Sequence, residues 1–215
     1  MSNNELGIFG GTFDPIHNGH IQSVLTTAKH LAISKVLLVP AHIPPHKNNV
    51  IANSQHRLKM AEMVCQHQPL FSCDARELKR DLPSYTVDTL KEISQSYPKQ
   101  TLYLFIGMDS LLNFTTWHQW QTILTLCHVV VSSRPSYSNE QMNQATKQLL
   151  AQHQVTTVDR LKQTPSGKIY IYQQADFSVS STNIRQKLQQ KSERLNDLPE
   201  YISQYINDHQ LYQKQ

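Results

Sequence analysis

The segment from Gly10 to His20 constrains the fold of this chain more than any other. It reads Gly-Gly-Thr-Phe-Asp-Pro-Ile-His-Asn-Gly-His. An apolar run at residues 6–9 precedes it and predicts a first strand, and residues 21–31 follow with apolar side chains at helical spacing. Glycines at the end of a strand let a ligand approach the backbone closely. The segment therefore predicts a strand, a ligand-binding turn and a helix in direct succession.

Two histidines, His17 and His20, stand at the predicted start of this helix, and their spacing places them on one face of it. The unpaired N–H groups and the dipole of a helix N-terminus attract anions. We therefore favour a phosphate site. A zinc site and a pair of core histidines are the alternatives, but the cysteines at positions 65, 73 and 127 are too scattered to complete a zinc site.

The composition suits a globular protein that binds small anions. The chain has 215 residues, enough for one α/β domain, and we expect a single domain spanning residues 1–215. The formal net charge is +4, from 20 basic and 16 acidic residues, and no block of lysine or arginine occurs. This balance does not favour a nucleic-acid partner, whereas it suits a pocket for polyanionic small molecules.

The sequence shows no sign of secretion or of a membrane. Residues 1–5 are polar, the apolar run that follows is too short for a secretory signal, and no stretch approaches the length of a membrane span. The three cysteines have no regular spacing, as expected for reduced thiols. We therefore expect a cytoplasmic protein with no membrane partner.

Short apolar runs alternate with helical patterns along the chain, which is typical of a parallel sheet built from crossover units. Strands are predicted at residues 6–9, 35–39, 70–74, 101–106, 128–132 and 168–172. Helices are predicted at residues 19–31, 54–66, 86–96, 138–152, 182–191 and 199–208. Several strands are continuously apolar, as in a sheet covered on both faces. We expect a Rossmann-like, doubly wound α/β fold with a small helical C-terminal part from about residue 182.

A second candidate phosphate site lies near the end of the chain. Ser180, Ser181 and Thr182 cluster where a helix is predicted to start, and Arg185 follows about one turn later. The hydroxyls can cap the helix, or they can hold phosphate oxygens together with its N–H groups. The arginine can reach the same end with a bidentate fork. Taken alone, this pattern is more often a helix cap.

The middle of the chain carries residues that suit a heterocyclic substrate. Asp109 follows the fourth predicted strand, a position that faces ligands in α/β folds. Trp117 and Trp120 come next, and we expect one in the core and the other with its ring face toward a planar heterocycle. For Lys47, in a proline-rich loop, solvation is the simplest explanation, and for Thr86, at a helix start, it is capping.

Several of these segments resemble signatures of one enzyme family. The first segment is similar to the H-x-G-H signature of the nucleotidylyltransferase superfamily. Residues 179–185 are similar to its I-S-S-T-x-I-R signature, with valine in place of the leading isoleucine. Three further segments resemble motifs of the bacterial nicotinate-nucleotide adenylyltransferases: Pro44–Lys47, Pro83–Leu90, and Gly107–Asp109 followed by Trp117.

The resemblance spans residues 6 to about 188 and implies a nucleotidyltransferase of NAD biosynthesis. Such an enzyme would transfer AMP from ATP to nicotinate mononucleotide, giving nicotinate adenine dinucleotide and pyrophosphate. The phosphate of the mononucleotide would attack the α-phosphorus of ATP in line, without a covalent enzyme intermediate. Mg²⁺ would arrive with ATP, held mainly by phosphates and water, and no dedicated metal site is expected.

The resemblance also implies roles for individual residues. The catalytic residues would be His17, His20 and Arg185. The residues that bind ATP would be Gly10, Gly11, Thr12, His17, His20, Ser181, Thr182 and Arg185. The residues that bind nicotinate mononucleotide would be His46, Lys47, Thr86, Asp109, Trp117 and His118. Among these, Trp117 would stack on the pyridine ring.

Three other functions stay open at this point. The enzyme could prefer the nicotinamide nucleotide, in which a neutral amide replaces the carboxylate, although residues 83–90 favour the acid. A nucleotide-binding module that has lost catalysis should lack a signature histidine or arginine, and this chain keeps them. An aminoacyl-tRNA synthetase remnant should have a tRNA-binding domain and a Lys-Met-Ser-Lys-Ser-like loop, and the sequence contains neither.

Overall fold

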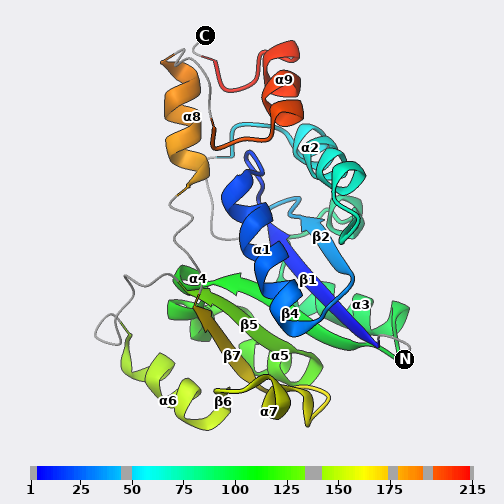
Figure 1. Ribbon diagram of the computed structural model, residues 1–215, viewed down its shortest axis with the longest axis vertical. Helices are drawn as coiled ribbons and strands as arrows, with labels where there is room; N and C mark the ends of the chain where they lie inside the picture. The colour runs from blue at the N-terminus through cyan, green and yellow to red at the C-terminus, as the bar shows by residue number, and fades with distance from the viewer. Residues whose placement is uncertain (1–3, 45–49, 134–141, 174–178, 191–195, 214–215) are drawn as a thin grey trace.

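The computed structural model describes residues 4–44, 50–133, 142–173, 179–190 and 196–213 (Figure 1). Its centre is a seven-stranded sheet with the order β3-β2-β1-β4-β5-β7-β6, in which every neighbouring pair is parallel. The strands are β1 (Glu5–Gly11), β2 (Val36–Pro40), β3 (Phe71–Cys73), β4 (Thr101–Gly107), β5 (His128–Ser133), β6 (Gln154–Val155) and β7 (Ile169–Gln173). The predicted Rossmann-like α/β fold is confirmed.

Helices of very different length connect the strands. The α-helices are α1 (Asn18–Leu31), α2 (Ser54–His67), α3 (Thr86–Ser96), α4 (Met108–Leu112), α5 (Trp120–Leu126), α6 (Gln144–His153), α7 (Val158–Lys162), α8 (Ser181–Gln189) and α9 (Glu200–Asp208). The 3-10 helices η1 (Arg76–Lys79) and η2 (Phe114–Thr116) lie in the connections. No helix in the described ranges is long and apolar enough to cross a membrane.

Helices cover both faces of the sheet because the strands are apolar on both faces. Val36 and Leu38 of β2 belong to a core shared with α1 and α2. Leu37 and Val39 of the same strand belong to a second core, shared with α3, α4 and α5. This alternation follows from the two-residue period of a strand. It explains why the strands appear in the sequence as continuous apolar runs.

The structure differs from the predicted elements mainly where segments are short. β6 has two residues, α4 and α7 have five each, and α5 has seven, so none shows a hydrophobic period that a sequence pattern could reveal. α6 begins at Gln144 instead of the predicted residue 138. Its cap is Asn143, whose side chain accepts a hydrogen bond from the N–H of Thr146. Residues 134–141 lie outside the described ranges.

The order of the strands changes direction between β1 and β4, and this position determines where a ligand can bind. From β1 the chain moves outward to β2 and β3, and it then returns to the other side of β1 and continues through β4 to β5. In parallel α/β sheets, connections on the two sides of such a switch diverge at the carboxyl ends of the strands and leave a crevice. Gly11 ends β1 and Gly107 ends β4, so both lie at this crevice.

Two C-terminal helices complete the fold: α8 lies near the start of α1, and α9 packs beside α2 (Figure 1). The ring of Tyr201 on α9 stacks on His67 of α2, with the centroids 3.8 Å apart. The backbone N–H of Asn18, the first residue of α1, donates to the carbonyl of Asp197 over 2.9 Å. The C-terminal part of the chain therefore contacts the turn between β1 and α1.

A buried arginine joins two loops at the carboxyl end of the sheet, the one after β1 and the one after β2. Arg57 lies on α2 and is only 1% exposed. Its guanidinium donates to the carbonyls of Thr12 (2.7 Å), Ala41 (2.6 Å), Ala52 (3.1 Å) and His42 (3.2 Å). Burial lowers the pKa of Arg57, and the negative charge of Asp14 opposes this effect. A buried charge is tolerated when hydrogen bonds and a counter-charge satisfy it, as they do here.

We predict that Arg57→Met lowers the free energy of unfolding by about 3–5 kcal/mol, because two loops lose a shared donor and Asp14 loses a nearby positive charge. Chemical denaturation followed by circular dichroism measures the change. Arg160→Met is the control, since Arg160 is exposed on α7, and a change within about 0.5 kcal/mol is expected there. Equal stability of the two variants would contradict the role of Arg57.

Candidate active site

Two cavities open at the crevice between the carboxyl ends of β1 and β4. The larger has a volume of about 910 Å³ and the smaller one of about 530 Å³. Both are lined by Gly10, Gly11, Thr12, Asp109 and Trp117. The cavities therefore share a wall, and a ligand with two parts can occupy both at once.

The larger cavity brings together the residues predicted to bind ATP. Its lining includes Gly10, Gly11, Thr12, His17, His20, Ser181, Thr182 and Arg185. These residues come from two segments far apart in the sequence, the region from β1 to α1 and the start of α8. The two predicted phosphate-binding segments thus face one common space.

His17 and His20 form a reciprocal cap at the start of α1. Nδ1 of His17 accepts from the backbone N–H of His20 (3.3 Å), and Nδ1 of His20 accepts from the backbone N–H of His17 (3.4 Å). The two rings stack with their centroids 3.6 Å apart. Because each Nδ1 is an acceptor, a neutral ring carries its proton on Nε2. Each ring can therefore offer an Nε2–H donor at the wall of the larger cavity.

The position of the His17 ring leaves little room for a side chain at position 19. A Cβ atom at Gly19 would lie 3.1 Å from Nδ1 of His17 and 3.2 Å from Cβ of Val179. Both distances are shorter than an ordinary van der Waals contact. Val179 directly precedes the cap of α8, so Gly19 lets the two phosphate-binding segments approach each other closely.

At the start of α8, one serine caps the helix and the next residues reach the cavity. The side chain of Ser180 accepts from a backbone N–H of the first turn (3.2 Å), so Ser180 is the cap. The hydroxyl of Ser181 donates to the carbonyl of Pro15 (3.1 Å), and Arg185 donates to the carbonyl of Asp14 (2.7 Å). Ser180 lines the larger cavity as well, so the cap of α8 is itself part of the cavity wall.

The smaller cavity contains the described residues that were expected to bind the mononucleotide. Its lining includes Thr86, Asp109, Trp117 and His118. The other two residues of that set, His46 and Lys47, lie outside the described ranges. Asp109 is exposed at the wall that the two cavities share. Within the described ranges, no group of three or more His, Cys, Asp or Glu side chains is arranged to hold a metal ion.

The smaller cavity also reaches the N-terminus of α3, which has no side-chain cap. Tyr85 is the N-cap residue, and its side chain makes no capping hydrogen bond. Thr86 is the first helical residue, so the simplest explanation of Thr86 as the cap is wrong. Among the described residues, the backbone N–H groups of Thr86 and Val87 have no hydrogen-bond acceptor. A helix end of this kind favours a negatively charged group.

Trp117 and Trp120 differ in their relation to the cavities. Trp117 lines both cavities, whereas Trp120 lines neither. Both pack on Phe114, with ring centroids 5.4 Å and 6.2 Å away, and both are partly exposed. Both tryptophans pack against the second core as partly buried side chains, so neither is fully enclosed by it. Trp117 is the tryptophan that can present its ring to a ligand.

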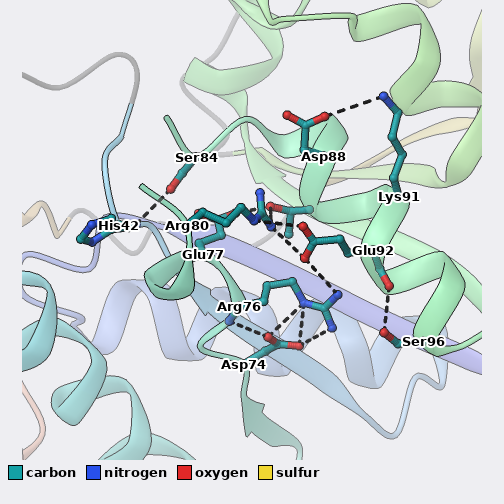
Figure 2. Close-up of polar contacts among 11 residues, drawn as sticks. His42, Asp74, Arg76, Glu77, Arg80, Ser84, Asp88, Lys91, Glu92 and Ser96 are labelled. Carbon is teal, nitrogen blue, oxygen red and sulfur yellow. Dashed lines mark hydrogen bonds and ion pairs between the residues drawn. The ribbon is translucent and has the colours of Figure 1, made fainter. Parts of the chain in front are cut away.

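A network of charged side chains includes Glu77, a residue of the wall of the smaller cavity (Figure 2). Glu77 of η1 lines this cavity, is 6% exposed, and accepts a hydrogen bond from the hydroxyl of Thr89 on α3. Arg80 donates to Thr89 (3.0 Å) and pairs with Glu92 (3.0 Å). Burial raises the pKa of Glu77, and hydrogen bonds from Thr89 and Ser84 oppose the rise. The network joins η1 to α3 beside the open helix end.

Sequence patterns do not single out Glu77, Arg57 or Tyr212, yet each lies in or beside the site. Glu77 follows β3, and its position beyond the carboxyl end of a strand is a signal that could identify it. Arg57 lies on the buried face of α2, and a charged residue among apolar ones on such a face indicates a specific role. Tyr212 donates to Asp14 over 2.8 Å, and no local pattern connects the two.

Comparisons with known proteins agree with this site. The cytidylyltransferase-like family matches residues 8–187, which include both phosphate-binding segments. A probable nicotinate-nucleotide adenylyltransferase of Shewanella frigidimarina is 39% identical over 208 residues, covering 96% of this chain and 99% of the relative. A probable nicotinate-nucleotide adenylyltransferase of Salmonella gallinarum is 44% identical over 207 residues, covering 95% of this chain and 97% of the relative.

Solved structures share the fold. A Plasmodium falciparum nicotinic acid mononucleotide adenylyltransferase complexed with NaAD has a TM-score of 0.72 at 18% identity, covering 97% of each chain. The same enzyme complexed with APC has a TM-score of 0.71 at 17% identity, covering 97% of this chain and 96% of the other. These two likenesses show the fold, and the bacterial relatives show the family. The chain belongs to the nicotinate-nucleotide adenylyltransferases of the cytidylyltransferase-like family.

Proposed function

We propose that this protein transfers AMP from ATP to nicotinate mononucleotide, releasing nicotinate adenine dinucleotide and pyrophosphate in NAD biosynthesis. The bacterial relatives at 39% and 44% identity carry the corresponding name and match nearly the whole chain. The proposal rests on one observation: two cavities with complementary chemistry share a wall. One has phosphate-binding donors, and the other has a tryptophan and an open helix N-terminus.

The larger cavity suits ATP. Gly10 opens onto it, and a Cβ atom there would meet no other part of the protein closer than 3.8 Å, which leaves space for a nucleotide. His17 and His20 supply ring donors, and Arg185 supplies a guanidinium fork that fits phosphate oxygens. The first turn of α8, with Ser181 and Thr182, adds hydroxyl and backbone donors for the same anion.

The smaller cavity suits nicotinate mononucleotide. Its pyridine ring stacks on Trp117, and its carboxylate accepts from the N–H groups of Thr86 and Val87 at the start of α3. A neutral carboxamide gains less from a helix N-terminus, so the acid is the preferred substrate. The family motif implies that His46 and Lys47 bind the phosphate of the mononucleotide. His118 borders the pyridine ring.

The reaction depends on positioning and needs no protein nucleophile. The phosphate of the mononucleotide is itself a nucleophile, and at the shared wall it can approach the α-phosphorus of ATP in line with the leaving pyrophosphate. Negative charge builds on the leaving oxygens as that bond breaks. The Nε2–H groups of His17 and His20 and the guanidinium of Arg185 stabilise this charge. No covalent enzyme intermediate forms.

Mg²⁺ bound to ATP would neutralise part of the phosphate charge in the larger cavity. Phosphate oxygens and waters satisfy most of the octahedral shell that Mg²⁺ prefers, so few protein ligands are needed. Asp109 fits such a site, since its exposed carboxylate at the shared wall can accept hydrogen bonds from waters of the ion. The cytoplasm is the proposed compartment, because the free thiols of Cys65, Cys73 and Cys127 are typical of a reducing environment.

Pyrophosphate release tests the proposed reaction. The purified protein receives ATP and Mg²⁺ together with either nicotinate mononucleotide or nicotinamide mononucleotide. We expect release with the acid and a kcat/KM about tenfold lower with the amide, because only the acid places a charge at the start of α3. Release with neither nucleotide would refute the reaction. Equal use of both would refute carboxylate recognition by α3.

We predict that His20→Ala lowers kcat by about 100-fold, because one donor to the leaving phosphates is lost in the transition state. Single-turnover quench experiments measure the chemical step, and thermal melting checks the fold. His67→Ala is the control, since His67 stacks on Tyr201 and lines neither cavity, so its kcat should equal that of the wild type. A single-turnover rate close to the wild type would exclude a catalytic role for His20.

We predict that Trp117→Ala raises the KM for nicotinate mononucleotide by about tenfold and the KM for ATP much less, because the variant loses a stacking surface for the pyridine ring. Initial rates at saturating concentrations of the other substrate measure both constants. Trp120→Ala is the matched control, because Trp120 packs on the same Phe114 but lines neither cavity. Equal effects of the two substitutions would show that packing alone explains the change.

A further inference from the structure

The end of the chain contacts the centre of the first phosphate-binding segment. Tyr212 lies beyond α9 and beyond residues 8–187, which the family matches. It is 4% exposed, and its hydroxyl donates to Oδ1 of Asp14 over 2.8 Å. Gln210 and Tyr212 have φ angles of 51° and 64°, a left-handed backbone that residues other than glycine seldom adopt. The tail turns sharply at these residues, and the turn directs the hydroxyl to Asp14.

Asp14 is a buried carboxylate in the turn between β1 and α1. Its Oδ2 accepts from the N–H of Ile51 (2.9 Å), and its Oδ1 accepts from the N–H of Ala52 (3.0 Å) as well as from Tyr212. Arg57 supplies a nearby positive charge. A buried carboxylate needs several hydrogen-bond donors, as Asp14 has here, because an unsatisfied oxygen in the protein interior lowers stability.

Arg185 and Asp14 both line the larger cavity and contact each other there. Its Nη1 donates to the carbonyl of Asp14 over 2.7 Å and lies 3.7 Å from Oδ2 of the same residue. Its Nη2 donates to the hydroxyl of Thr182 over 3.4 Å, and the side chain lines the cavity. The carboxylate of Asp14 and a triphosphate in this cavity are therefore competing partners for one guanidinium.

We propose that Tyr212 is a positioning residue for the ATP site, because its hydroxyl satisfies Asp14 and so leaves Arg185 available to the triphosphate. The inference rests on the proposed function of the larger cavity as the ATP site. Tyr212 lines neither cavity, and its hydroxyl meets the site through its hydrogen bond to Asp14. Burial and the adjacent charge of Asp14 raise the pKa of Tyr212, so the hydroxyl keeps its proton and remains a donor.

Removal of the Tyr212 hydroxyl should weaken the binding of ATP and leave the binding of nicotinate mononucleotide unchanged. Oδ1 of Asp14 loses a donor in a buried position, and Arg185 is close enough to shift from 3.7 Å into a tight ion pair with this carboxylate. ATP must then break that pair when it binds, so its affinity falls. Neither Asp14 nor Arg185 lines the smaller cavity, so the binding of nicotinate mononucleotide does not depend on Tyr212.

Tyr212→Phe tests the proposal, with Tyr205→Phe as the matched control. Like Tyr212, Tyr205 lines neither cavity, and its hydroxyl forms a hydrogen bond with one side chain, at Nδ1 of His56 over 2.8 Å. We expect Tyr212→Phe to raise the KM for ATP by about tenfold, with an unchanged KM for nicotinate mononucleotide. The rise in melting temperature that ATP and Mg²⁺ produce should shrink in this variant and stay at the wild-type value in Tyr205→Phe.

A wild-type KM for ATP in Tyr212→Phe would overturn the proposal, even if this variant melted at a lower temperature. Equal increases in the two KM values would also overturn it, because they would indicate general loosening of the fold. If the wild type released no pyrophosphate with any mononucleotide, the proposed reaction would fail. The melting shift with ATP alone would then still decide whether Tyr212 supports the nucleotide site.

Discussion

The site depends on two buried opposite charges, Asp14 and Arg57, which hold the loops around it and attract each other. Both side chains are buried, at 3% and 1% exposure, and each satisfies backbone groups of loops that end at the crevice. Arg57 binds carbonyls after β1 and β2, and Asp14 binds the N–H groups of Ile51 and Ala52. Neither charge would be stable in this position without the other and its hydrogen bonds. The glycine turn thus has a defined shape before any ligand binds.

The parts of the molecule that could be predicted from sequence have local causes. The strands are apolar on both faces, and this pattern alone predicts a covered parallel sheet. His17 and His20 follow a glycine turn at a helix start, so their anion-binding potential is visible in one short segment. The prediction that this segment and the start of α8 serve one site depended on the family resemblance, because no local rule brings distant segments together.

The parts that could not be predicted depend on contacts between distant residues. Tyr212 and Asp14 are 198 positions apart, and a single tyrosine in a polar tail has no pattern that points to a partner. Glu77 becomes part of the smaller cavity only when η1 packs beside α3. Short elements such as β6 also lack a detectable period. A strand of two residues depends on its pairing with β7 and not on a pattern of its own.

A crystal structure of the protein with nicotinate adenine dinucleotide tests the central claim most directly, which is that the two cavities form one site for the two halves of the product. We expect the pyridine ring on Trp117, its carboxylate within hydrogen-bond distance of the Thr86 N–H, and the adenylate half in the larger cavity with His17 and Arg185. A dinucleotide bound in the opposite direction, or confined to one cavity, would contradict this account.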